Sequence, residues 1–198
     1  MKIIVGLGNP RHVFENTRHN LGFQFVNHLA KVWRFYESGH SGSRCGNGFT
    51  EWLKCHRCYI STGYVNSTSV CLVKPRTLMN LSGYTLKSFI DPSFKLEDIL
   101  IVVDDIAIPI GTYRLKAKGS SGGHNGLKSI ESSLGSQEYA RLRIGLKPIN
   151  NEIPSVSDFV MGEVTKEERV QIEALYPKLT SLVETWITDG IITALNKQ

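Results

Sequence analysis

The sequence predicts an α/β fold with a mixed central sheet, formed by one domain that spans residues 1–198. Continuous apolar runs at Met1–Leu7 and Ile99–Val103 are typical of buried strands. Segments whose apolar residues recur at helical spacing alternate with such strands along the chain. The hydrophobic fraction of 41% is sufficient for one core, and we find neither a repeat nor an evident linker in the sequence.

The first part of the chain begins with the strand Met1–Leu7, which ends at Gly8 and Pro10. A helix is expected over Gly22–Arg34, because apolar residues recur there every three or four positions. The Gly/Ser-rich stretch Ser38–Gly48 predicts a mobile loop.

Two further strands, Trp52–Thr62 and Ser69–Val73, are expected to form a hairpin whose turn lies near Tyr64–Ser67. The segment "MNLSGYTLKSFI" predicts a helix that begins near Leu81. Ile99–Val103 is apolar throughout, which indicates a central strand covered on both faces.

In the second half, Thr112–Lys118 alternates polar and apolar residues, as a strand with one face in water does. The segment "GSSGGHNG" predicts a flexible loop that leads to a helix at Leu127–Leu134. Arg141–Leu146 alternates charged and apolar residues and is expected to be a half-buried strand. Thr165–Glu167 supplies the N-cap and acidic first turn of a helix, and Pro177 opens the last helix.

The charge of the chain makes a polyanionic partner plausible, since the formal net charge is +5 and the pI is about 9.0. Basic residues gather in a stretch in which Glu131 and Glu138 are the acidic residues. They are Arg114, Lys116, Lys118, Lys128, Arg141 and Arg143. The cluster indicates either a solvated basic face or a phosphate-binding surface. No apolar run approaches the roughly 18 residues of a membrane span, and we see no apolar region of a secretory signal.

The four cysteines do not form a complete zinc motif. Cys55 and Cys58 have the CxxC spacing of a zinc ligand pair, but Cys45 and Cys71 stand alone. Reduced structural thiols of an intracellular type of protein are therefore favoured over a metal site.

The glycine-rich segments do not match the common nucleotide motifs. The segment "GLGNP" resembles the start of a dinucleotide fingerprint, but Arg11 stands where the last glycine is needed and Pro10 lacks a backbone N–H. A P-loop needs glycine directly before its lysine, and Leu127 precedes Lys128.

Polar residues instead follow or flank the apolar strands: Asn9, His19, Asn80, Asp104, Asp105, His124 and Asn125. Ligand sites in open α/β sheets lie at the carboxyl ends of strands, and Asn9 and Asp104 fit this rule if their strands are parallel. A histidine braced by a carboxylate can activate water, and asparagines can bind amides, esters and ribose hydroxyls. This set indicates water-mediated acyl cleavage, although each residue alone also fits a turn, a cap or a strand end. No HxxxH or similar spacing supports a metal at the histidines.

Taken together, the segments "VGLGNPRHVFENTRHNLGF", "VKPRTLMNLSG", "DDIAIPIGTYRLKAKGSSGGHNGLKSI", "YARLRIGL" and "FVMG" resemble bacterial-type peptidyl-tRNA hydrolases in order and spacing over essentially the whole chain. The resemblance implies a single α/β domain with a twisted mixed sheet flanked by helices. It also implies cleavage of the ester between a peptide and the terminal ribose of tRNA, without metal or cofactor, which recycles tRNA from stalled translation.

The resemblance assigns roles to particular residues. His19 is the expected general base and Asp104 the acid that orients it. Asn9 is expected near the attacking water and the ester, while Asn80 and Met79 hold the peptide main chain.

On the tRNA side, the resemblance places Asn125 against the substrate and Phe14 where the family often has a tyrosine. Lys116 and Arg143 match positions that bind phosphate near the acceptor end. Arg114, Lys118 and Arg141 are expected to widen this surface. The expected partner is peptidyl-tRNA, bound at its acceptor stem and CCA end by a monomer. The expected location is the cytoplasm, away from the membrane, or a mitochondrion or plastid if a transit peptide is cleaved.

Some positions depart from the family pattern. Ala107 lacks the usual acidic side chain, Asp105 replaces a glutamate, and the Cys-bearing region Ser38–Cys71 has no assigned role. A second hypothesis, from another functional class, is a noncatalytic RNA-binding or intron-splicing factor on the same scaffold. His19 and Asp104 favour the enzyme.

Overall fold

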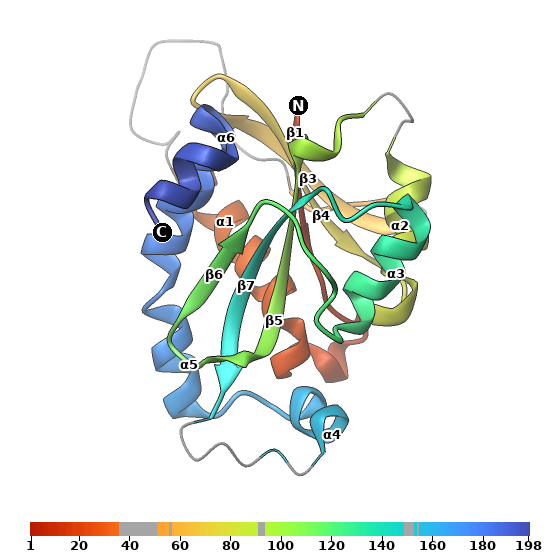
Figure 1. Cartoon of the computed structure of the whole chain (residues 1–198), viewed down its shortest axis with the longest axis vertical. Coiled ribbons are helices and arrows are strands. Elements are labelled where there is room, and N and C mark those ends of the chain that lie inside the picture. Colours follow the sequence, from red (N-terminus) through yellow and green to blue (C-terminus); the bar gives the residue numbers. More distant parts are fainter. Residues whose placement is uncertain (36–50, 56, 91–93, 149–152, 154) are drawn as a thin grey trace.

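The computed structural model describes residues 1–35, 51–55, 57–90, 94–148, 153 and 155–198 and has three layers, with helices on both faces of a sheet (Figure 1). The strands are β1 (Lys2–Gly6), β2 (Leu53–Lys54), β3 (Cys58–Val65), β4 (Thr68–Pro75), β5 (Ile99–Pro109), β6 (Tyr113–Lys116) and β7 (Ala140–Lys147). The helices are α1 (Leu21–Phe35), α2 (Ser82–Phe89), α3 (Asn125–Leu134), α4 (Val156–Met161), α5 (Lys166–Glu173) and α6 (Tyr176–Asn196). Short 3₁₀ turns are η1 (His12–Phe14), η2 (Arg18–Asn20), η3 (Met79–Leu81) and η4 (Leu96–Asp98).

The seven strands form one mixed sheet in the order β2-β3-β4-β1-β5-β7-β6. β4, β1, β5 and β7 are mutually parallel, and β2, β3 and β6 pair antiparallel at the two edges. The predicted fold class is therefore confirmed. Because β1 and β5 are adjacent and parallel, the residues that follow their apolar runs, Asn9 and Asp104, lie at the same end of the sheet.

Alternate residues of the central strands face two separate hydrophobic cores. Ile4 of β1 packs in the core that α1 and α6 cover. Ile3 and Val5, which point to the opposite face, pack in the core that α2 and α3 cover. This burial on both faces explains why β1 is apolar throughout.

Several predicted elements are confirmed. β3 and β4 form the expected hairpin, and its turn residues Asn66 and Ser67 have positive φ. Thr165 caps α5, and Glu168 completes a capping box with it. Local signals of this kind depend on neighbouring residues alone, which makes them readable in the sequence.

Other predictions need correction. The strand expected at Ile99–Val103 continues to Pro109, because β7 goes on pairing with it. β7 was expected to be half-buried, yet Arg141 and Arg143 are buried together with its apolar residues. The long strand expected at Trp52–Thr62 is interrupted between β2 and β3, and α4 was not predicted. The loop expected at Ser38–Gly48, with Cys45, lies outside the described residues.

The thiols within the described part of the chain are free. Cys58 and Cys71 are buried and Cys55 is half-buried. Burial raises the pKa of Cys58 to about 11 and that of Cys71 to about 12, so both are protonated near neutral pH. In the described residues, no helix combines the length and the apolar character that a membrane crossing requires.

A pair of glycines brings α1 against β1 and thereby places the residues before α1. A Cβ on Gly22 would meet the backbone N of Leu7 at 2.4 Å and the backbone O of Val102 at 2.4 Å. A Cβ on Gly6 would meet the backbone O of Gly22 at 2.3 Å. Backbone atoms cannot move aside as a flexible side chain can, so only glycine allows this approach.

Gly22→Ala should therefore lower the free energy of unfolding by about 1–3 kcal/mol, the usual cost of overpacking a core. The measurement is urea denaturation. Lys31→Ala, at an exposed position of the same helix, should change stability by less than about 0.5 kcal/mol. Equal stability of Gly22→Ala and the wild type would show that α1 can shift away from β1.

Candidate active site

A cavity of about 720 Å³ opens at the carboxyl ends of β1 and β5. All seven residues predicted for catalysis or substrate binding line it: Asn9, Phe14, His19, Met79, Asn80, Asp104 and Asn125. They come from four separate stretches of the chain, residues 9–19, 79–80, 104 and 125, so the sheet topology is what brings them together. A volume of this size is typical of a site for a small molecule or group.

His19 and Asp104 form a buried hydrogen-bonded pair inside this cavity. Nδ1 of His19 lies 2.9 Å from Oδ1 and 3.1 Å from Oδ2 of Asp104. A carboxylate only accepts hydrogen bonds, so Nδ1 of His19 carries the proton and donates it. In the neutral ring, Nε2 then keeps its lone pair and is able to take a proton.

His124 is a second histidine on the same carboxylate, and no role was predicted for it from the sequence. Its Nε2 lies 3.2 Å from Oδ1 of Asp104, and its ring centroid lies 4.9 Å from that of His19. Its Nδ1 accepts the backbone N–H groups of Gly126 at 3.1 Å and Leu127 at 3.4 Å, which makes His124 the N-cap of α3. Because Nδ1 is an acceptor, Nε2 carries the proton and donates to Asp104.

The charges of this group determine the pKa values of its members. Burial disfavours the charge of Asp104, but His124 and His19 outweigh it and hold the pKa of Asp104 well below its usual range. Burial also lowers the pKa of His19, and the charge and hydrogen bond of Asp104 outweigh it, so the pKa is raised from the ordinary value. Asp104 thus stays ionised beside two imidazoles.

Asn9 is fixed from both its backbone and its side chain. Asn20 accepts the backbone N–H of Asn9 at 2.8 Å and donates to the backbone O of Asn9 at 3.0 Å. Oδ1 of Asn9 accepts the backbone N–H of Met79 at 3.0 Å. The remaining amide group of Asn9 has only a long contact of 3.8 Å with the sulfur of Met161. It is therefore a positioned donor at the cavity wall.

One set of potential metal ligands lies within 4.8 Å of each other in the described residues, and it consists of His19, Asp104 and His124. A histidine that binds metal through one nitrogen normally donates the N–H of the other. In His124 the other nitrogen accepts two backbone N–H groups, so Nε2 must keep its proton. The donor set therefore fits a hydrogen-bonded group and does not fit a resident metal.

Two of the five predicted phosphate-binding cations are turned inward. Arg141 is fully buried, forms an ion pair with Glu131 at 3.7 Å and donates to the backbone carbonyls of Gly119 and Ser120. Arg143 lines the cavity, but its guanidinium donates to Asp105 at 3.0 Å and to backbone carbonyls of residues 120 and 121. Both side chains hold the loop that leads to His124.

The other three predicted cations lie on the surface. Arg114 and Lys116 are exposed on the edge strand β6, and Lys118 is exposed just beyond it. Lys118 forms an exposed ion pair of 3.3 Å with Glu138, which contributes little in water. These cations are accessible to a polyanion.

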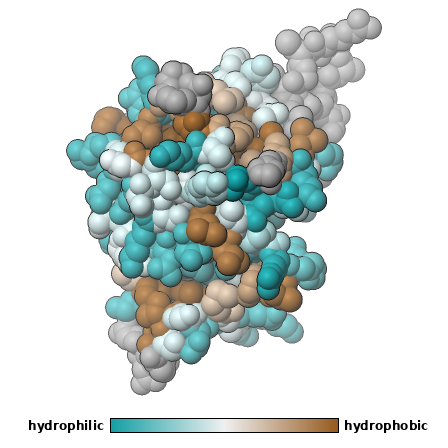
Figure 2. Space-filling view, turned by 90° about the vertical axis from the view of Figure 1, so that its right-hand side faces the viewer, coloured by the Kyte–Doolittle hydropathy of each residue, from teal (hydrophilic) through white to brown (hydrophobic). Residues whose placement is uncertain are grey.

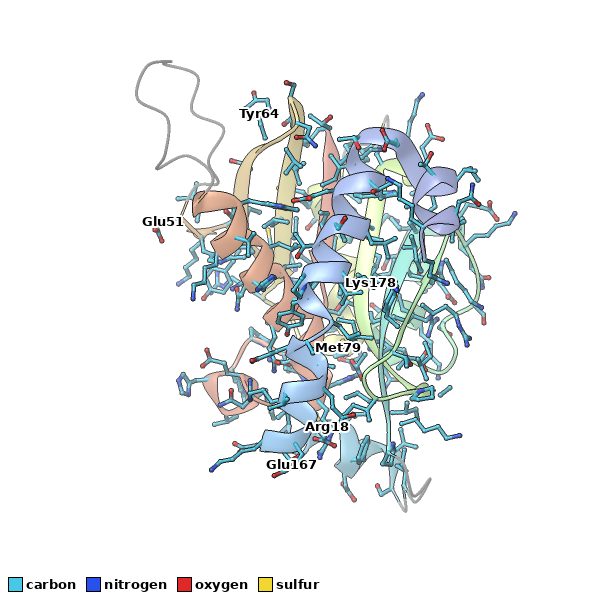
Figure 3. The ribbon with its side chains drawn as sticks, turned by 90° about the vertical axis from the view of Figure 1, so that its left-hand side faces the viewer. Arg18, Glu51, Tyr64, Met79, Glu167 and Lys178 are labelled. Atoms are coloured by element: carbon cyan, nitrogen blue, oxygen red, sulfur yellow. The ribbon has the colours of Figure 1, made fainter. Side chains whose placement is uncertain are left out.

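One wall of the cavity is apolar and is attached to the segment that carries His19. Val160 and Met161 of α4 line the cavity. Arg18 donates to both carboxylate oxygens of Glu168 and to the backbone O of Phe159, which ties α4 and α5 to η2. Figure 3 shows Arg18 close to the start of α5, where Glu167 is labelled. Figure 2 shows hydrophobic patches among hydrophilic surface on the side of α2, α3 and α4. Leu78 and Val156, which also line the cavity, are half exposed.

Comparisons with known proteins agree with this geometry. A family model described as peptidyl-tRNA hydrolase matches residues 3–198. The peptidyl-tRNA hydrolase of Gemmatimonas aurantiaca is 40% identical, with 99% of this chain and 98% of the relative covered. That of Bacillus subtilis is 39% identical, with 100% and 97% covered. The crystal structure of peptidyl-tRNA hydrolase from Acinetobacter baumannii superposes with a TM-score of 0.83 at 30% identity, covering 100% of this chain and 93% of that one.

The coupling between His19 and Asp104 is testable by titration. The NMR-monitored pKa of His19 should lie above its ordinary value of 6.5 in the wild type. In Asp104→Asn it should fall below 6.5, because burial then acts without the opposing charge. His28, whose pKa burial and Lys31 lower, is the internal reference and should not change. An unchanged pKa of His19 would mean that Asp104 does not control its protonation.

Proposed function

Because the chain belongs to the peptidyl-tRNA hydrolase family, whose members act on the ester bond of peptidyl-tRNA, we propose that His19 is the general base of this reaction. Nε2 of His19 takes a proton from a water molecule as that water attacks the ester carbonyl. The carboxylate of Asp104 stabilises the imidazolium that forms and keeps the ring oriented through Nδ1. The single observation that carries the proposal is the pair of short contacts between Asp104 and Nδ1 of His19.

His124 serves as a positioning residue for Asp104 in this proposal. It donates to the same carboxylate oxygen that His19 contacts, and the start of α3 holds its tautomer. Asp104 is thereby kept in one orientation and ionised. The developing positive charge of His19 then faces a carboxylate that does not need to reorganise.

The amide group of Asn9 is proposed to stabilise the oxyanion of the tetrahedral intermediate. Oδ1 of Asn9 accepts the backbone N–H of Met79, and this hydrogen bond fixes the orientation of the side-chain NH₂ group. A preorganised donor of this kind lowers the barrier because it is already oriented when charge develops. In this mechanism water attacks the ester directly, and no covalent intermediate forms on a serine or cysteine.

The peptide and the tRNA are proposed to occupy different parts of the cavity. Asn80 and Asn125 are exposed carboxamides at the wall and suit the main chain of the peptide and the ribose side of the substrate. Binding through main-chain groups makes the pocket tolerant of peptide sequence. Phe14 offers a ring that is able to stack on the terminal base or to pack the pocket wall.

Arg114, Lys116 and Lys118 are proposed to bind phosphates of the acceptor stem while the CCA end enters the cavity. Contacts to phosphates supply affinity that does not depend on tRNA sequence. Arg141 and Arg143 support this surface from within by holding the adjacent loop. We propose that the chain acts as a monomer, since one chain contributes all of these groups. No finding favours the noncatalytic alternative.

Hydrolysis of an N-acetylated aminoacyl-tRNA tests the proposed base. His19→Ala should lower the single-turnover rate constant by about 10²–10⁴-fold, the usual contribution of general base catalysis. The measurement is release of free tRNA under single-turnover conditions. His28→Gln, on α1 and away from the cavity, is the matched control and should keep its rate.

Substrate binding and the wild-type rate are measured together with the rate of the variant. His19→Ala should retain binding of the uncleaved substrate, which shows that the site is still folded. Equal rates for His19→Ala and the wild type would remove His19 from the mechanism, and tight tRNA binding without any wild-type hydrolysis would favour the noncatalytic alternative.

The phosphate surface is testable through salt dependence. Arg114→Gln and Lys116→Gln should each raise KM and reduce the slope of log affinity against log salt by about 1. Lys87→Gln, an exposed lysine on α2, is the charge-matched control. Unchanged slopes in both variants would show that phosphates do not contact β6.

A further inference from the structure

A second cavity of about 430 Å³ lies beside the catalytic one. Asn9 is the one described residue that lines both. The turn η1 separates them: Phe14 lines the catalytic cavity, while Arg11, His12 and Glu15 line the second. The mechanism proposed above uses none of the side chains that lie in the second cavity alone.

The second cavity contains a lysine ammonium group surrounded by rings. Nζ of Lys74, at the end of β4, lies 4.0 Å from the ring centre of Trp52, 5.7 Å from that of Tyr59 and 5.9 Å from that of Phe23. Within the described residues, it donates one hydrogen bond, to Oδ1 of Asn27 at 2.7 Å. An ammonium group has three N–H donors, so two of them remain for a ligand.

Lys74 has no counter-ion among the residues that the structure describes. The acid with the largest effect on it is Glu15, which also lies 3.3 Å from Nε2 of His12, a contact that is an ion pair only when His12 is protonated. Burial lowers the pKa of Lys74 to about 8, and Glu15 opposes this only in part. A partly buried cation without a partner is costly, and an anion in the cavity would offset that cost.

The other charged groups around the cavity leave the balance positive. Arg169 pairs with Glu173 at 3.8 Å and approaches the side chain of Asn16 at 3.5 Å. Arg11 is exposed at the rim and forms no ion pair within the described part of the chain. The three cations that line the cavity, Lys74, Arg11 and Arg169, outnumber its two acids, Glu15 and Glu173.

The arrangement suits a phosphate group better than a carboxylate. A lysine ammonium is a point charge with donors in several directions, which suits the oxygens of a phosphate. Carboxamides that line the cavity, from Asn16, Gln24 and Asn27, add polar groups around it. The ring of Tyr59 also lines the cavity and offers a planar surface for a base.

We propose that this second cavity binds the phosphate group of a nucleotide, with Lys74 as the anchoring cation. The phosphate group is either that of a free nucleotide or that of a nucleotide unit near the 3′ end of the tRNA. The second source rests on the proposed function, because it requires the terminal ribose to occupy the neighbouring catalytic cavity. The first source does not.

Calorimetric titration with inorganic phosphate and with AMP, in a buffer free of other phosphate, tests the site. Lys74→Met should weaken binding of both ligands by about tenfold or more, while Lys74→Arg retains most of it. Lys54→Met, which removes an exposed lysine from the edge strand β2, is the matched control and should bind as the wild type does. Binding should weaken as the pH rises through about 8, because Lys74 loses its charge there.

Two controls separate this site from other phosphate sites and from misfolding. The double variant Arg114→Gln/Lys116→Gln should still bind phosphate, since β6 lies at the far edge of the sheet. Thermal unfolding without ligand shows whether Lys74→Met is folded. Equal affinity of Lys74→Met and the wild type, or an equal response to acetate, would overturn the proposal.

The two sources of the phosphate are distinguished by steady-state kinetics on N-acetylated aminoacyl-tRNA. A raised KM with unchanged kcat in Lys74→Met assigns the site to a nucleotide of the substrate, and unchanged constants assign it to a free nucleotide. His19→Ala should bind AMP as the wild type does. Failure of the proposed base is thereby separated from failure of the second site.

Discussion

The buried carboxylate of Asp104 is the constraint on which the site depends. It accepts hydrogen bonds from His19 and His124, which belong to segments on opposite sides of β5 in the sequence. An isolated carboxylate at this depth would be strongly disfavoured. The start of α1, the start of α3 and the middle of β5 must therefore keep their relative positions for the charge to be tolerated. Gly22 permits this arrangement by letting α1 touch the sheet.

In the proposed mechanism, Asp104 also determines which nitrogen of His19 receives the proton. His124 holds its proton on Nε2 because backbone N–H groups occupy its Nδ1, so it serves only as a donor to Asp104. His19 presents Nδ1 to the same carboxylate, which leaves Nε2 as the nitrogen able to receive a proton. Networks of buried hydrogen bonds strengthen each other in a low dielectric. Two chemically identical side chains thus have different roles because their second nitrogens have different neighbours.

The sequence predicted what depends on local pattern and missed what depends on distant pairing. The strand at Met1–Leu7 was readable because it is apolar on both faces. The inward orientation of Arg141 was not readable, since alternating charge is typical of a wet strand and the carbonyls that bind it come from another loop. The role of His124 required knowing both its cap and its distance from Asp104. The resemblance to a known family predicted that His19 and Asp104 act together. The spacing of the residues alone left each of them with an ordinary structural explanation.

The asparagine pair shows why the two cavities need to be considered together. The side chain of Asn20 binds both the backbone N–H and the backbone O of Asn9, and the side chain of Asn9 binds the backbone N–H of Met79. Three segments are thus joined by buried hydrogen bonds, each of which would leave an unsatisfied polar group if broken. Asn20 lines the second cavity and Met79 lines the catalytic one. The wall between the two cavities is therefore a network of buried hydrogen bonds. A ligand in one cavity contacts groups whose positions also depend on residues that line the other cavity.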